Sequence, residues 1–107
     1  MTTEERFAEI STALRGIPGV SVGASRKGFG SSALCVSKKI FAMVTSKGGF
    51  VVKLPKDRVA ALVAARAGSR FEPARGRFMN EWIVVDPDWN GDWLSLAREA
   101  MRFVRNK

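Results

Sequence analysis

Arginine side chains near the end of the chain have the spacing of a single helical face. Arg98, Arg102 and Arg105 recur at i, i+4 and i+7, so a helix through them would carry all three on one side. Such a stripe can neutralise phosphates along a nucleic-acid backbone and release the counterions bound there. The alternative is an ordinary solvated helix face, on which the helix dipole favours cations near the C-terminus. Both interpretations stay open for the stripe.

Two glycine-containing segments carry further basic residues close to aromatic ones, namely Arg26, Lys27 and Phe29 in the first and Arg75 and Arg77 in the second. Guanidinium groups, accessible backbone and a stackable ring are what recognition of single-stranded nucleic acid uses. The glycine spacing matches no phosphate-binding loop. The competing interpretation is that the glycines form turns and that Phe29 or Phe78 packs at the edge of a sheet.

The tryptophans are a third group of candidate binding residues. Trp82 and Trp89 have the flat apolar rings that line small-molecule pockets or stack on bases. The usual alternative is that such rings seal a small core, and this interpretation is favoured for Trp93.

The sequence argues against an enzyme. It contains no histidine and a single cysteine, Cys35, so Ser-His and Cys-His nucleophile pairs are excluded. The local acidic cluster is Asp86, Asp88 and Asp92, but Ala97 stands where a calcium loop would need its final glutamate. Pro87 and Asp88 are better explained as turn and cap residues. We therefore expect no catalytic residue, no metal and no cofactor.

Helical patterns begin and end the chain. Thr2 and Glu5 fit a capping box for a first helix, which Gly16 and Pro18 end. Its apolar face is predicted to consist of Phe7, Ile10 and Leu14. A last helix is predicted from about Gly91 to Arg105, capped by Asp88 or Asn90. Its apolar face would carry Trp93, Ala97, Ala100, Met101 and Val104.

Short apolar runs between these helices predict strands. Three or four strands are expected from Val20 to Lys53, joined by turns rich in glycine, lysine and serine. A second helix is expected over Lys56–Ala67, with Gly68 at its end, then a loop over Glu72–Arg77 and a strand over Glu81–Val85. The resulting order, α, three or four β, α, β, α, indicates a single α+β domain over residues 1–107, with an antiparallel sheet and helices packed on one face.

Several of these runs resemble the TfoX N-terminal domain-like family, which is related to the MmcQ/YjbR proteins and has a YjbR/CyaY-like fold. The segments that carry the resemblance are Lys39–Ala42, Lys53–Pro55, Gly76–Trp82 and Trp93–Ala100. At Phe78 and Asn80 the family pattern would have proline and lysine. The resemblance implies an antiparallel sheet flanked by helices, and a regulatory or accessory role with DNA binding.

The net charge indicates the kind of partner, and the cysteine content and apolar runs indicate the cellular compartment. The net charge of +8 implies attraction to polyanions or acidic proteins. The unpaired Cys35, the absence of a basic and apolar leader, and the short apolar runs predict a cytoplasmic protein with no membrane contact. We expect a non-enzymatic binding module for nucleic acid. The alternatives are an adaptor that recognises an acidic protein, as a monomer or a homodimer, and, less favoured, a ligand carrier or enzyme with a pocket near Trp82 and Trp89.

Overall fold

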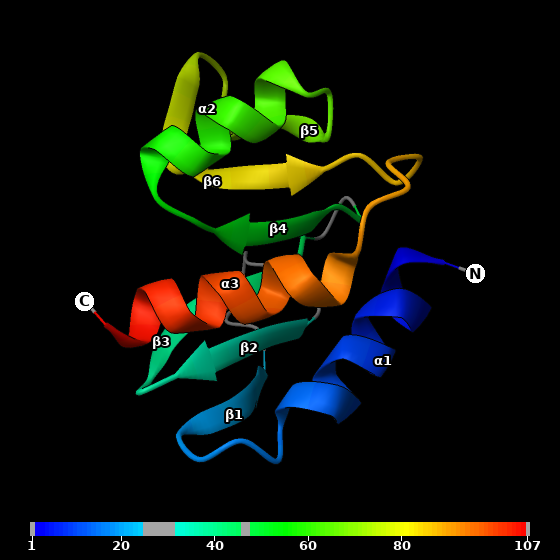
Figure 1. Cartoon of the computed structure of the whole chain (residues 1–107), viewed down its shortest axis with the longest axis vertical. Coiled ribbons are helices and arrows are strands. Elements are labelled where there is room, and N and C mark those ends of the chain that lie inside the picture. Colours follow the sequence, from blue (N-terminus) through cyan, green and yellow to red (C-terminus); the bar gives the residue numbers. More distant parts are fainter. Residues whose placement is uncertain (1, 25–31, 46–47, 107) are drawn as a thin grey trace.

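The computed structural model describes residues 2–24, 32–45 and 48–106, which form three helices and six strands (Figure 1). The helices are α1 (Thr3–Leu14), α2 (Lys56–Ala64) and α3 (Trp93–Arg105). The strands are β1 (Val20–Ala24), β2 (Ser32–Val36), β3 (Lys39–Val44), β4 (Phe50–Lys53), β5 (Gly68–Ala74) and β6 (Arg77–Val85).

All six strands belong to one antiparallel sheet in the order β1-β2-β3-β4-β6-β5. The first four strands form a meander, because each short connection lets a strand pair with its predecessor. β6 then pairs with β4, and β5 lies outside it at the edge of the sheet. The predicted α+β class with an antiparallel sheet is therefore confirmed.

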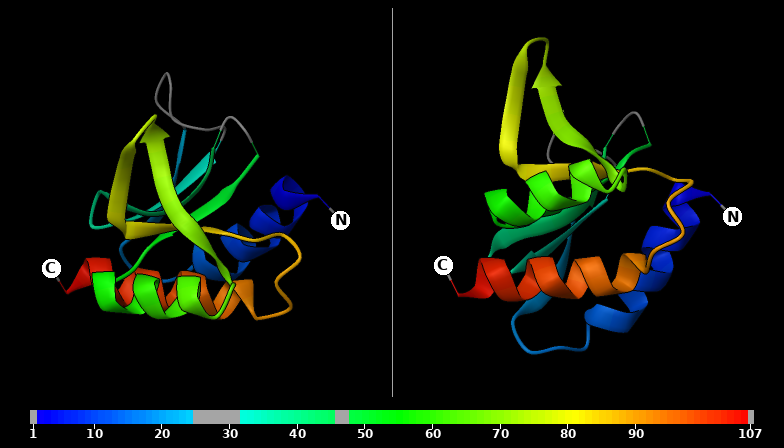
Figure 2. Two further views of the ribbon diagram at one scale, coloured as in Figure 1. Left: turned by 90° about the horizontal axis from the view of Figure 1, so that it is seen from above. Right: turned by 45° about the horizontal axis from the view of Figure 1, so that its top comes forward.

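The helices cover one face of this sheet, and the main core lies between the two layers (Figure 2). Phe50 of β4 stands near its centre. Its ring stacks on Trp93 with centroids 4.6 Å apart and meets the Phe7 ring edge-on at 6.0 Å. The predicted apolar faces of α1 and α3 point into this core, because Ile10, Leu14 and every named residue of the last helix are buried.

The opposite face of the sheet carries no helix but has a small apolar cluster of its own. Ala33, Met43 and Val51 are buried there. Partly buried apolar side chains surround them, namely Ile40, Phe71, Trp82 and Val84. The strands alternate between the two clusters, since Phe50 and Val52 face the helices whereas Val51 faces away from them.

The region between α2 and α3 differs from the prediction. A hairpin of two strands, β5 and β6, replaces the expected loop over Glu72–Arg77 and single strand over Glu81–Val85. The outer half of this hairpin is exposed on both faces, so its sequence lacks the apolar and polar alternation that marks a half-buried strand.

The ends of two helices also differ from the prediction. α2 stops at Ala64, because Arg66 takes a left-handed conformation with φ of 62° and Ala67 N–H donates to Leu62 O. The cap of α3 is Asp92, neither Asp88 nor Asn90. The Asp92 carboxylate accepts from the Ser95 hydroxyl and the Leu94 N–H, and these hydrogen bonds, that of Ser95 foremost, lower the pKa of Asp92.

Candidate nucleic-acid interface

The outer half of the β5–β6 hairpin, residues 72–80, extends away from the helix layer as a two-stranded ribbon (Figure 2). We call these residues the hairpin arm. All of them are exposed, so neither face of the arm packs on the core. An isolated two-stranded ribbon is only marginally stable in water. The arm forms nonetheless because its strands continue inward into the six-stranded sheet.

The turn at the tip of the arm is fixed by local contacts. Gly76 has a φ of 79°, a left-handed conformation that glycine adopts without strain. Its N–H donates to the Glu72 carboxylate over 2.6 Å, and Ala74 pairs with Arg77 across the turn. The Glu72 carboxylate is therefore already engaged by a backbone N–H of the turn.

A shift in strand register separates the arm from the rest of the sheet. Arg70 pairs with Ile83, but the next residue, Phe71, pairs with Met79 instead of Trp82, the partner in an unbroken ladder. Register irregularities of this kind bend a strand and increase its local twist. The shift accounts for the direction of the arm, which leaves the plane of the sheet (Figure 2).

The arm presents two guanidinium groups beside apolar side chains. Arg75 and Arg77 are exposed on either side of Gly76. Phe78 follows directly and is 59% exposed, and Met79 is 38% exposed. The alternative that Phe78 packs at the sheet edge is therefore wrong. The sequence pointed to the arginines but not to the exposure of Phe78 and Met79, although their place beside Arg77 was the available signal.

The arginine stripe lies on α3 as the spacing predicts. Arg98, Arg102 and Arg105 are all exposed, on the side of α3 away from its buried residues. Two of them already act within the fold. Arg105 Nη2 donates to Pro18 O over 3.3 Å, and the charge of Arg98 is a minor contribution to the lowered pKa of Asp92.

The structure thus divides the predicted basic residues between two surfaces. The stripe belongs to the helix layer, and the arm extends from the hairpin in the opposite direction (Figure 2). The third predicted group, Arg26, Lys27 and Phe29, lies outside the described residues.

The two candidate tryptophans do not share a pocket. Trp82 is partly buried on the helix-free face, with Lys53 Nζ 5.6 Å from the centroid of its ring. Trp89 lies between β6 and α3, where it packs against the helix-side core. Its ring covers Gly91 so closely that a Cβ atom at Gly91 would collide with it. Trp89 therefore belongs with the core residues.

We expect Gly91→Ala to displace the Trp89 ring and to lower the free energy of unfolding by about 1–3 kcal/mol, the usual cost of overpacking. Urea unfolding followed by circular dichroism measures this change. Gly16→Ala is the matched control, because a Cβ atom at Gly16 meets no other atom within 4 Å. Equal stability of the two variants would contradict the assignment of Trp89 to the core.

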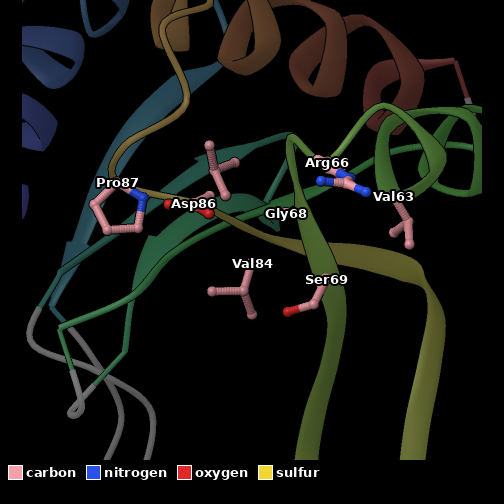
Figure 3. A pocket seen from close by; sticks show the side chains of 8 residues that line it. Val63, Arg66, Gly68, Ser69, Val84, Asp86 and Pro87 are labelled. Carbon is pink, nitrogen blue, oxygen red and sulfur yellow. The ribbon is translucent and has the colours of Figure 1, made fainter.

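The cavity shown in Figure 3 lies at the opposite end of β5 from the arm and has a volume of about 470 Å³. Arg66 and Asp86 contribute charged groups, while Val63 and Val84 contribute apolar surface. Its lining contains neither Trp82 nor Trp89. Asp86 already accepts from the Asp88 N–H over 2.8 Å, as expected of a turn residue.

No protein-family model, no curated protein and no solved structure matches this chain. Within the described residues, the helices are too short and too polar to cross a lipid bilayer.

Proposed function

We propose that this protein is a non-enzymatic binding module that holds nucleic acid on its hairpin arm. The observation that carries the proposal is the exposure of Arg75, Arg77 and Phe78 together on a ribbon whose residues 72–80 are all exposed. A structural role would bury the Phe78 ring, whereas a binding role requires it to be accessible.

Each component of the arm suits a nucleic-acid ligand. Guanidinium groups form strong, charge-assisted and often bidentate hydrogen bonds with phosphate oxygens. The strands of a ribbon lie about 4.8 Å apart, and β-ribbons contact DNA in either the major or the minor groove. The net charge of +8 adds long-range attraction, which raises the rate of encounter with a polyanion.

The α3 stripe has a secondary role in this proposal. The stripe lies on α3 in the helix layer, whereas the arm extends away from that layer, so a duplex held by the arm is proposed to contact the arm first (Figure 2). Its charges contribute to the overall field of the protein. The proposal therefore predicts different losses of affinity for substitutions on the arm and on the stripe, and matched pairs of substitutions can compare them.

The wider relationships are part of the same proposal. We propose that the chain belongs with the TfoX N-terminal domain-like proteins, has the YjbR/CyaY-like fold and acts in the cytoplasm. The sequence segments at Lys39–Ala42 and Gly76–Trp82 support the first point. An antiparallel sheet with helices on one face agrees with the second.

Fluorescence anisotropy with labelled duplex DNA, single-stranded DNA and RNA tests the function directly. We expect duplex binding at about 50 mM salt, with log affinity falling against log salt at a slope of about −2 or steeper, since each phosphate contact contributes about 0.9. Competition with poly-L-glutamate separates nucleic-acid recognition from a general attraction to acidic chains. Flat traces with every nucleic acid at low salt would overturn the proposal. Equal competition by polyglutamate would point to an acidic protein partner instead.

A further inference from the structure

We propose that Phe78 is a wedge that inserts between two base pairs of duplex DNA and bends the duplex. This inference rests on the proposed function and names its substrate, double-stranded DNA, together with the mode of contact. Proteins that bend DNA in this way insert an apolar side chain into a base step and hold the flanking phosphates with basic residues.

The exposure of Phe78 is exceptional within this chain. Phe7, Phe41 and Phe50 are at most 2% exposed, whereas Phe78 is 59% exposed. Only two other large hydrophobic side chains among the described residues are exposed, and one of them is the neighbouring Met79. Phe78 therefore leaves its ring in water directly beside Arg77, and a partner that accepts both an apolar ring and a cation fits this part of the hairpin.

The positions of the charges fit a wedge. Successive strand residues point to opposite faces, so Phe78 stands on one face of the ribbon and Arg77 on the other. One residue advances the strand by about 3.4 Å, so Arg77 adjoins Phe78 along the strand, and its long side chain is the group that we assign to the phosphates flanking the opened step. Arg75 extends the same basic tip from the other side of Gly76.

A wedge must also be held firmly while it separates stacked bases. The arm is held at both ends of its length. At the tip, the Glu72 carboxylate accepts the Gly76 N–H over 2.6 Å. At the base, β6 continues into the sheet, where Val85 and Ile83 are buried and paired with β4. The ring therefore stands on a ribbon continuous with the core.

The same observations favour a duplex over a single strand. Binding of single strands normally uses several aromatic rings on which successive bases stack. Phe78 is the one exposed ring among the described residues of the hairpin, since Phe71 and Trp82 are partly buried on the helix-free face. A lone ring next to Met79, with arginine on the adjoining position, has the composition of a wedge.

The bend can be measured by energy transfer between dyes at the two ends of a duplex of about 20 base pairs that contains a central TA step, which kinks easily. We expect the wild-type protein to raise the transfer efficiency on binding. Phe78→Ala should abolish this rise while weakening binding by no more than about 10-fold, because the arginine contacts with phosphate remain. Phe78→Leu, which keeps an apolar wedge, should restore most of the bend.

Val22→Ala is the matched control, since Val22 is also an exposed hydrophobic residue, at 51%, but lies on β1. It should leave both binding and bending unchanged. Duplex binding without any rise in transfer, or an equal rise with Phe78→Ala, would overturn the wedge and leave the proposed function standing. Tighter binding to single strands than to duplex would do the same. Absence of binding to every nucleic acid would overturn both.

Discussion

Replacing Arg75 and Arg77 together by alanine is expected to lower the affinity for duplex DNA by about 100-fold at low salt. In the proposed complex each guanidinium makes a charge-assisted hydrogen bond with phosphate, and the loss of one such bond costs about 1.5 kcal/mol. Two losses give about 3 kcal/mol, which corresponds to a factor of roughly 100 in the dissociation constant. The slope of log affinity against log salt should also become shallower by about 1.8, because two phosphate contacts are lost. Anisotropy titrations at several salt concentrations measure both quantities.

The double variant Arg98→Ala, Arg102→Ala provides the control. It also removes two positive charges from exposed positions, but these positions lie on α3 and not on the arm. A long-range effect of net charge would weaken binding equally in the two variants. We expect the α3 variant to lose less than about 5-fold, because screening at about 0.1 M salt confines charge effects to roughly 10 Å. A larger loss in the α3 variant would move the interface from the arm to the stripe.

Replacing Phe50 by alanine produces the largest expected loss of stability, about 3–5 kcal/mol. Phe50 is 1% exposed and contacts both Trp93 and Phe7 through its ring. Truncation removes these contacts and leaves a cavity between the sheet and two helices. Domains of this size commonly have a free energy of unfolding of only about 5–15 kcal/mol, so this substitution removes a large part of it. Urea unfolding followed by circular dichroism gives the difference in free energy.

Val22→Ala is a suitable reference for this measurement as well, since substitutions at exposed positions usually change stability by less than about 0.5 kcal/mol. A loss below about 1.5 kcal/mol for Phe50→Ala would contradict the close packing around the ring. It would indicate that α1 and α3 are held to the sheet mainly by other contacts.

The parts of the fold that follow from the sequence are those whose apolar residues repeat with a local period. Phe7, Ile10 and Leu14 identified α1, and the helical spacing of Trp93, Ala97 and Val104 identified the buried side of α3. The strand β5 could not be found in this way. Its residues from Glu72 to Ala74 are exposed, and pairing with β6 is what makes them a strand.

The candidate site was likewise predictable where it depends on residue type, and it was not predictable where it depends on contacts between residues far apart in the sequence. Arg75 and Arg77 were identifiable as a basic segment because their charge is evident from residue type alone. The direction of the arm depends on the register shift at Phe71, which involves Met79 on another strand and leaves no local pattern. The cap of α3 was misplaced for a related reason, since Asp86, Asp88 and Asp92 are equally suited by type to cap a helix.

The order of the elements along the chain also bears on how the protein is synthesised. All six strands precede α3, and yet α3 contacts β2, β3 and β4 and supplies Trp93 to the core. Without α3, part of the apolar face of the sheet is therefore uncovered. Nascent chains in this state are prone to aggregate and to engage chaperones. A variant truncated between β6 and α3 should thus be prone to aggregate.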